Sequence, residues 1–544
     1  MVDWQPPPGT TGNPRLIRTS PRWLREDPRD CPRGVALHAR KLVFQQPERP
    51  LRKPVEAFAL APVMAVLDDV EHRGKSVDAA VARMRKVRTY LPAHRDWAEE
   101  AARRYLAARS AFLHERHVLG EPETRPADEE WVVIDSLPEP DARGAARYER
   151  TAWGRRYATP DGSLRELWLP SVNVVKEDRP RAEVAEAAAV AAEGVPAHSE
   201  FRRPYRPVRG SVTLPQRVRV VAVGCGDGIT AVLADRTREE AVQDFRAHAR
   251  PVLARVVEGE KLIPGSSCVD CEALATCAEP PRVRQLLGVR APRRPRRRRS
   301  VSVSDLRAHS QCPARFHLTR VLHLRSGEPE SAAIRRGRAV DNWLNERHGA
   351  WREGSCRDTA PPDALPGLAE EEQPVALRLV RHHASRCPVA HLAADETVRV
   401  QPRVTAYDPD LDVIVIADAD LLYTQHGGWV WRETKTAARR VWEGRPLLKA
   451  YPQLALAVLL LAAGVPGGDP RRSRVELEVL HPDGAACEEL DPGDSATVDE
   501  ARAALAGLAA GWALDEEYPA KPGDHCVGCE AQRWCAPGRA QVEG

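Results

Sequence analysis

The fold is decided by a stretch late in the chain: Val413-Ile-Val-Ile-Ala-Asp-Ala-Asp-Leu-Leu-Tyr423, then Gln425-His-Gly-Gly428, then Trp429-Val-Trp-Arg-Glu-Thr-Lys-Thr436. The two longer segments are rich in β-branched and aromatic residues, which favour strands. The short segment between them has the composition of a tight turn. The sequence therefore predicts a β-hairpin here.

The position of the turn decides which side chains face each other across this hairpin. If His426 and Gly427 form a two-residue turn, Asp420 lies opposite Glu433. A turn one residue later would instead pair Asp420 with Lys435. Because side chains alternate along a strand, Glu433 and Lys435 share one face in both cases. Both registers bring two carboxylates and a lysine together.

This group of charges has two interpretations. Two close carboxylates repel each other unless a cation lies between them, and paired oxygen ligands suit Mg²⁺ or Mn²⁺. A lysine beside such a site can orient a water molecule and stabilise negative charge on a phosphate. Only nine of the 81 basic residues are lysines, so Lys435 departs from the chain's preference for arginine. The simpler alternative is an ordinary cross-strand ion pair.

Eight of the twelve cysteines form two like-spaced sets. Each set has a C-x2-C-x5-C knuckle with Glu-Ala directly after its second cysteine, a lone Cys-Pro far upstream, and a predicted strand, turn and helix before the knuckle. The sets are Cys31, Cys268, Cys271 and Cys277, and Cys312, Cys526, Cys529 and Cys535. Four thiolates suit a [4Fe–4S] cluster, whereas zinc sites usually pair two short knuckles. We expect a cluster in the second set and a possible second one in the first, with zinc or no metal as the alternatives.

The repeated order of motifs divides the chain into two related units. We expect the first at residues 1–285, with a helical insertion at about 55–119, and the second at residues 301–544. A basic, proline-rich linker at 286–300 separates them. The linker is either simply solvated or contacts DNA phosphates through Arg296, Arg297, Arg298 and Arg299. The remaining cysteines show no pattern and are interpreted as ordinary thiols: Cys225, Cys356, Cys387 and Cys487.

Length and composition bound the class of protein. The chain has 544 residues, 42% hydrophobic and 29% charged, with a net charge of +4, which is typical of a folded protein and too weakly basic to indicate nucleic-acid binding alone. The longest apolar run, 454–465, is too short to span a bilayer. We expect a cytoplasmic protein without a secretory signal or a membrane partner.

In combination and order, the motifs between residues 300 and 540 resemble those of the RecB-type branch of the PD-(D/E)xK nuclease superfamily. They are most similar to its iron–sulfur members, such as the AddB nuclease domain and the CRISPR adaptation exonucleases. The motifs are Ser304-Asp-Leu, Gln311-Cys312-Pro313, Phe316, Arg336-Gly-Arg-Ala-Val-Asp341, Asp420, Glu433-Thr-Lys435-Thr436, Tyr451-Pro-Gln453 and the Cys526, Cys529, Cys535 knuckle. The resemblance implies an α/β fold of tandem restriction-endonuclease-like units. Each unit would be a central mixed sheet flanked by helices and closed by a four-cysteine cluster.

The resemblance also implies roles for individual residues. Asp420 and Glu433 would ligate a catalytic Mg²⁺ or Mn²⁺, and Lys435 would position the attacking water. Gln453, with Tyr451 nearby, would support the site from the following helix. The four C-terminal cysteines would hold the iron–sulfur cluster.

The chain departs from the family pattern at two positions. Asp341 stands where the family usually has a histidine ligand; aspartate can also bind Mg²⁺ or Mn²⁺. Ala417 replaces a glycine that usually lies three residues before the metal aspartate. Asp418, on the same strand as Asp420, is an alternative ligand.

Two functions follow as expectations. The first is a metal-dependent DNA nuclease, exonucleolytic on single strands or duplex ends, in bacterial DNA repair, recombination or defence. The second is a catalytically silent iron–sulfur DNA-binding or scaffold subunit of a helicase–nuclease complex, because the N-terminal half contains no E-x-K motif and is interpreted as a degenerate copy. The sequence has no helicase P-loop, so a helicase partner would be a separate chain.

Overall fold

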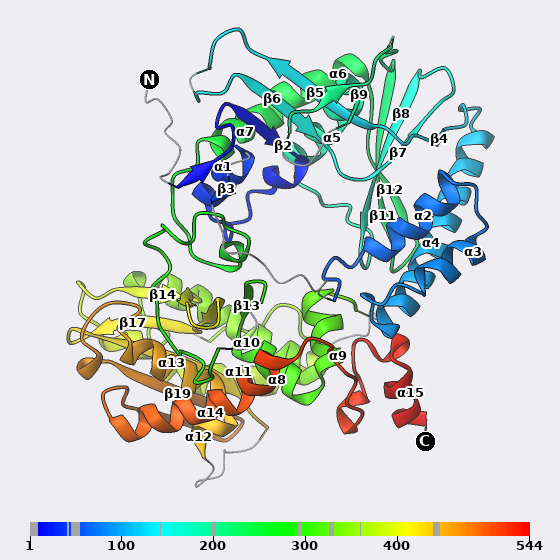
Figure 1. The fold of residues 1–544 in the computed structure, drawn as a ribbon. Coiled ribbons are helices and arrows are strands. Elements are labelled where there is room, and N and C mark those ends of the chain that lie inside the picture. The colour runs from blue at the N-terminus through cyan, green and yellow to red at the C-terminus, as the bar shows by residue number, and fades with distance from the viewer. Residues whose placement is uncertain are drawn as a thin grey trace.

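The computed structural model describes residues 9–40, 43–44, 55–141, 143–198, 203–210, 212–291, 296–325, 331–359, 361–438 and 446–543. Figure 1 shows two sheet-containing units, one drawn in blue to green and the other in green to orange. The red C-terminal segment, which ends in α15 (Ala536–Glu543), lies beside the long blue helix α4 (Pro92–Val118) of the first unit (Figure 1). The C-terminal end of the second unit therefore contacts the first.

The N-terminal unit contains two five-stranded sheets. The first has the order β10 (Arg206–Pro207), β9 (Val195–His198), β5 (Glu130–Ser136), β6 (Arg147–Thr151) and β2 (Leu16–Thr19). The second has the order β12 (Thr230–Thr237), β11 (Arg217–Gly224), β8 (Leu164–Ser171), β7 (Arg155–Ala158) and β4 (Arg125–Pro126). A separate short pair joins β1 (Thr10–Thr11) to β3 (Val43–Phe44).

The C-terminal unit also contains two sheets. The smaller has the order β13 (Arg299–Val301), β16 (Val413–Asp418) and β15 (Arg403–Asp408). The larger has the order β14 (Val398–Val400), β17 (Leu421–Gln425), β18 (Gly428–Thr436), β19 (Arg474–His481) and β20 (Gly484–Leu490).

The N-terminal sheet that contains β8 and β11 shares its strand plan with the larger sheet of the C-terminal unit. In the N-terminal unit, β7 pairs with β8 in antiparallel orientation, β8 with β11 in parallel, and β11 with β12 in antiparallel orientation. In the C-terminal unit, the three successive pairings of β17, β18, β19 and β20 have the same orientations in the same order. The other sheets agree as well, since β2 pairs in parallel with β6 as β13 does with β16. The predicted fold class, an α/β fold of mixed sheets flanked by helices, is confirmed.

In each unit a helix makes the crossover between the two parallel strands, as parallel pairing requires. These crossover helices are α5 (Arg181–Glu193) and α13 (Pro452–Ala462). The helices that follow the last strands are α6 (Arg238–Asp244), α7 (Arg250–Val257) and α14 (Ser495–Leu514). The other helices of the units are α1 (Pro32–Ala39), α8 (Val303–Gln311), α9 (Pro313–Phe316), α10 (Ala332–Gly349), α11 (Gln373–Ala384) and α12 (Leu447–Ala450).

The predicted helical insertion of the first unit consists of α4 and two shorter helices, α2 (Ala61–Glu71) and α3 (Val77–Met84). The apolar residues of these helices form one core with the side chains Tyr157 and Trp168 of the neighbouring sheet. The insertion therefore covers one face of that sheet.

The apolar run that the sequence shows at 454–465 forms most of α13. Its side chains from Leu454 to Leu461 are buried because the helix is packed between the larger sheet and α14. A helix that is apolar on all sides belongs in a protein core or a membrane. Here it is a core helix, and no helix in the described part of the chain is long and apolar enough to cross a membrane.

Each cysteine knuckle packs against the other unit. In the N-terminal knuckle, Cys268 and Leu274 lie in an apolar cluster with Ile414 of β16. In the C-terminal knuckle, Trp534 packs into the core of the helical insertion, and its indole N–H donates to Glu100 Oε2 of α4 at 2.9 Å. The contact between the units is thus reciprocal.

The segment 413–423 differs from the single strand predicted by its sequence. β16 ends at Asp418, the chain bends at Ala419 and Asp420, and β17 begins at Leu421 in a different sheet. Two successive buried strands have the same continuous apolar composition as one long strand. The residue pattern therefore does not predict the bend.

The basic linker also differs from the exposed segment expected at 286–300. Residues 292–295 lie outside the described part of the chain. The Arg296 guanidinium donates to the carbonyls of Leu514 and Asp515 at the end of α14. The remaining three arginines also have protein partners: Arg297 pairs with Asp270, Arg298 pairs with Asp412, and Arg299 stacks on the ring of Trp512. These contacts hold the four arginines to the protein, and among these four Arg297 alone has a mostly exposed side chain.

Candidate active site and metal centres

The hairpin β17–β18 positions the candidate active site. Its pairs run from Leu421 with Arg432 to Gln425 with Gly428. His426 and Gly427 form the turn with φ angles of 52° and 80°, the left-handed conformation that a type I′ turn requires. The register is therefore the first of the two that the sequence allowed.

Asp420 lies in the bend immediately before β17. It is one residue beyond the last pair of the hairpin, Leu421 with Arg432, and therefore lies opposite Glu433. Its Oδ2 atom accepts a hydrogen bond from the backbone N–H of Thr434 at 2.7 Å. The Lys435 ammonium donates to the same Oδ2 at 3.1 Å and to Glu433 Oε2 at 2.9 Å. The Trp431 indole N–H donates to the other oxygen of Glu433 at 3.1 Å. Two carboxylates and one ammonium thus converge where the hairpin opens.

The fourth charged group comes from a helix. Asp341 lies on α10, and its Oδ2 accepts from the amides of Asn345 at 3.2 Å and Gln401 at 2.7 Å. A close approach brings this helix to β18, since a Cβ atom on Gly337 would lie 3.2 Å from Thr436 Oγ1. The glycine therefore lets α10 carry Asp341 to the end of the hairpin.

The electrostatics of the site reflect crowded negative charge. Burial raises the pKa of Glu433, whose side chain is 5% exposed, and the neighbouring carboxylate of Asp420 raises it further. Burial likewise raises the pKa of Asp341, again with repulsion from Asp420. Burial opposes the charge of Lys435, but attraction to Glu433 and Asp420 outweighs it and raises the pKa of the ammonium. Three carboxylates share one ammonium, so this donor set fits a divalent cation.

The other predicted site residues lie at the end of β16 and at the start of α13. Asp418 pairs with Arg403 at 2.8 Å and is about half exposed, whereas Asp420 contacts Lys435 and the backbone N–H of Thr434. Tyr451 is half-buried against the C-terminal core, and Gln453 is half-buried in the first turn of α13.

The N-terminal unit has apolar residues at the equivalent positions. Counting from the first pair of each parallel ladder, Leu167 and Leu169 of β8 lie where Glu433 and Lys435 lie on β18. Both leucines are buried against α5. This strand therefore offers no carboxylate and no ammonium at these positions.

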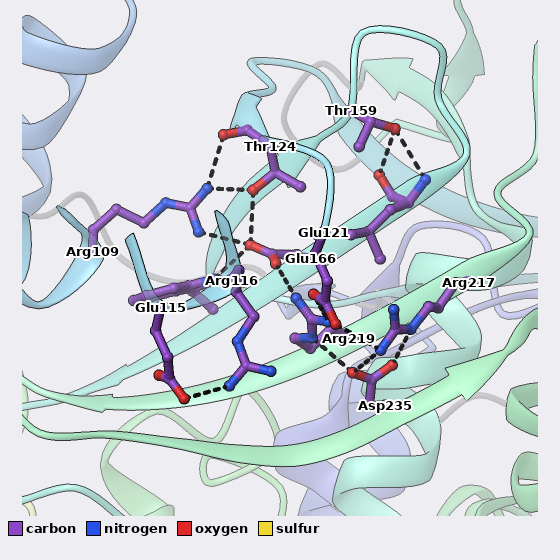
Figure 2. A network of polar contacts seen from close by, with 12 residues as sticks. Arg109, Glu115, Arg116, Glu121, Thr124, Thr159, Glu166, Arg217, Arg219 and Asp235 are labelled. Atoms are coloured by element: carbon purple, nitrogen blue, oxygen red, sulfur yellow. Dashed lines mark hydrogen bonds and ion pairs between the residues drawn. The ribbon is translucent and has the colours of Figure 1, made fainter. Parts of the chain in front are cut away.

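The opposite face of the N-terminal sheet holds a buried ionic network instead (Figure 2). Glu166 accepts from Arg109 at 2.7 Å and from Arg219 at 2.9 Å. Glu166 and Arg219 are register partners, and the equivalent pair in the second unit, Arg432 and Glu476, has the opposite polarity at 2.8 Å. The two sheets thus keep a buried ion pair at the same place with its charges exchanged.

The structure brings each set of four cysteines together. Cys312, Cys526, Cys529 and Cys535 border a cavity of about 20 Å³. Gly538 also borders this cavity, and a Cβ atom there would lie in van der Waals contact with Cys535 Sγ at 3.4 Å. Cys31, Cys268, Cys271 and Cys277 border a larger cavity of about 220 Å³. Each set of four cysteines therefore lines one cavity, although the two members of a set farthest apart in sequence are separated by more than 200 residues.

One group of candidate ligands was missed by sequence interpretation. Its members are His348, Cys356, His383 and Cys387, which are all buried, and their ligand atoms lie within 4.8 Å of one another. Two of these were interpreted as ordinary thiols. The available signal was the pairing of a histidine with a nearby cysteine twice, at 348 and 356 and again at 383 and 387.

An α/β fold with a carboxylate–lysine group at the end of a central hairpin defines the class of protein, the PD-(D/E)XK fold. A family model described as "PD-(D/E)XK nuclease superfamily" matches residues 300–536. Members of this superfamily are generally nucleases that use divalent metals and act on DNA, and the matched region contains the hairpin, α10 and the C-terminal cysteines. No curated protein matches the chain. Among solved structures, one titled "Crystal structure of SSO0001" is 15% identical with a TM-score of 0.22, and the match covers 44% of this chain and 85% of that one.

Proposed function

We propose that the chain is a Mg²⁺- or Mn²⁺-dependent deoxyribonuclease that acts exonucleolytically on single strands or duplex ends in bacterial DNA repair, recombination or defence. The observation that carries this proposal is that the Lys435 ammonium lies within 3.1 Å of both Asp420 and Glu433, with Asp341 beside them. The match of residues 300–536 to a nuclease superfamily supports it.

In this proposal Asp341, Asp420 and Glu433 hold the cation. When bound, the cation would activate water and neutralise charge on the phosphate. The Lys435 ammonium orients the attacking water, because it is held by two carboxylates and keeps a donor free for a third partner. Tyr451 and Gln453 support the site from the start of α13.

The four C-terminal cysteines hold a [4Fe–4S] cluster in this proposal, as in the RecB-type iron–sulfur branch. Their convergence from two ends of the unit supports it, because such a clip closes a long loop. The N-terminal unit is a degenerate copy that packs against the active one and contacts DNA, and its own four cysteines hold a second metal centre. Any DNA unwinding comes from a separate helicase subunit.

The proposal is tested by metal-dependent degradation of labelled DNA. We expect Lys435→Ala and Glu433→Gln to lose at least about 100-fold in rate, because each removes a group that acts on the reacting water or on the metal. The matched control is Asp418→Asn on the adjacent strand, whose side chain pairs with Arg403 instead; its rate should stay within about twofold of wild type.

Equal degradation by wild type and Lys435→Ala would refute the nuclease proposal. DNA binding by wild type without turnover in Mg²⁺ or Mn²⁺ would favour the silent DNA-binding subunit. That function is favoured by Asp341 at the usual histidine position and by the leucines in the N-terminal copy.

A further inference from the structure

A second metal-ligand group lies on the far side of the larger C-terminal sheet from Glu433. His348 is in the last turn of α10, Cys356 follows in the next loop, His383 is in the last turn of α11, and Cys387 follows it. The side chains of this group are 0–4% exposed. Leu421, Tyr423 and Val430 of the hairpin form an apolar cluster with the two cysteines. The group is therefore fully enclosed by protein.

The distances within this group match the coordination of one ion. His348 Nε2 lies 3.1 Å from His383 Nε2 and 3.8 Å from Cys387 Sγ. A tetrahedral zinc ion with ordinary bond lengths separates two nitrogen ligands by about 3.4 Å and a nitrogen from a sulfur by about 3.6 Å. Two histidines and two cysteines can also hold a [2Fe–2S] cluster, in which each pair of ligands binds a different iron. Four ligand atoms within 4.8 Å of one another leave room for a single ion.

A neighbouring carboxylate orients the ring of His383, one of the two histidines of this group. Glu478 Oε2 lies 2.7 Å from His383 Nδ1, so the Nδ1–H donates to the carboxylate and the lone pair of Nε2 points towards His348. A carboxylate that orients a histidine ligand in this way is typical of zinc sites. The Arg432 guanidinium pairs with the other oxygen of Glu478 at 3.0 Å. Two thiolates also balance the charge of Zn²⁺, which makes burial of the group favourable.

We propose that His348, Cys356, His383 and Cys387 form a structural zinc site. All four tetrahedral positions are filled by protein, so the ion has no open position for a substrate. The site ties the end of α10 to α11 and, through Glu478 and Arg432, to β18. It therefore fixes the helix that carries Asp341 and the strand that carries Glu433. The proposal is independent of the nuclease function, because it concerns only these ligands.

The test is the metal content of the full-length protein purified without oxygen. Zinc, iron and acid-labile sulfide are measured in wild type, in the double variant Cys356→Ser/Cys387→Ser and in Cys487→Ser. Cys487 is the matched control, because it is a half-buried cysteine on β20 opposite Glu478 in the register. We expect the double variant to contain about one zinc fewer per chain than wild type and than the control, with iron unchanged in all three.

Zinc-edge X-ray absorption on wild type keeps the proposal testable if the double variant does not fold. The expected spectrum contains imidazole nitrogen at about 2.0–2.1 Å together with sulfur at about 2.3 Å. Wild type without zinc, equal zinc in wild type and the double variant, or a zinc spectrum without imidazole would each overturn the proposal. A disulfide between Cys356 and Cys387, detected by mass spectrometry, would also overturn it.

Discussion

Lys435 is the residue on which the candidate active site depends. It is one of nine lysines in an arginine-rich chain, and its ammonium is the shared partner of Asp420 and Glu433. A guanidinium is larger and planar, so it could not occupy the same position between the two carboxylates and also direct a donor to a water. Asp341 adds a third carboxylate, which makes the site unfavourable without a cation and favourable with one.

Asp341→Asn should weaken metal binding and raise the stability of the metal-free protein. Removal of this carboxylate ends its repulsion with Asp420, which, together with burial, raises the pKa of Asp341, so the variant should melt at a higher temperature than wild type in chelator. The stabilisation that wild type gains from saturating Mn²⁺ should shrink, because the half-saturating metal concentration rises about tenfold or more.

Thermal melts in chelator and across a Mn²⁺ titration measure both effects. The Asp418→Asn variant should follow wild type in both conditions. An Asp341→Asn protein with wild-type metal dependence would show that this carboxylate is not a ligand.

At the scale of elements, the turn of the hairpin β17–β18 fixes the register of the two strands and therefore the positions of the site residues on β18. The start of β18 also packs against the backbone of the segment before β19: a Cβ atom on Gly428 would lie 2.0 Å from the carbonyl oxygen of Arg472. Only glycine permits this approach. Since the pairing of β18 with β17 and β19 begins there, the approach sets the position of Glu433 and Lys435 in the sheet.

Gly428→Ala should therefore destabilise the C-terminal unit by about 2 kcal/mol, which lowers the apparent melting temperature by roughly 5 °C. The matched control is Gly507→Ala in the middle of α14, where an added Cβ meets nothing within 4 Å. This control should be stabilised by about 0.5–1 kcal/mol, because alanine favours the helix. Equal melting temperatures for the two variants would contradict the close approach at Gly428.

At the scale of the whole molecule, the two units are joined by reciprocal contacts of their cysteine knuckles and by a buried histidine. His317 Nε2 lies 3.1 Å from the carbonyl oxygen of Glu56, and its ring stacks on Tyr518. Burial, with repulsion from His94, lowers the pKa of His317 to about 4. The histidine is therefore neutral where the second unit contacts the segment before the helical insertion.

This histidine should make the protein acid-sensitive. The unfolded chain binds a proton at His317 below about pH 6.5 while the folded protein does not, so stability is present above that pH and falls as the pH drops towards 4. The loss between pH 7.5 and 5.5 should be about 1 kcal/mol from this residue. Glutamine keeps a donor for the Glu56 carbonyl but does not titrate.

Melting temperatures of wild type and His317→Gln at pH 7.5 and pH 5.5 measure this effect. The difference between the two pH values should be smaller in His317→Gln than in wild type and unchanged in His114→Gln, an exposed position on α4. An equal pH effect in all three proteins would contradict a buried neutral His317.

Local rules account for what the sequence determined by itself. Strand alternation places Glu433 and Lys435 on one face, because it depends on neighbouring residues only. The sequence left two hairpin registers open, and the structure has the one with its turn at His426 and Gly427. The two cysteine sets could be recognised because their spacing repeats. These features involve the intrinsic geometry of a short segment or a count along the chain.

The tertiary structure alone decided the rest. Sequence interpretation missed the bend at Asp420, and therefore the outward direction of Asp418, because a continuous apolar run does not show which sheet each half joins. The approach of Asp341 depends on α10 packing against β18. The grouping of His348 with Cys387 depends on two helix ends meeting behind that sheet. Contacts of this kind join segments distant in sequence, and packing of the folded chain, not local pattern, determines which segments meet.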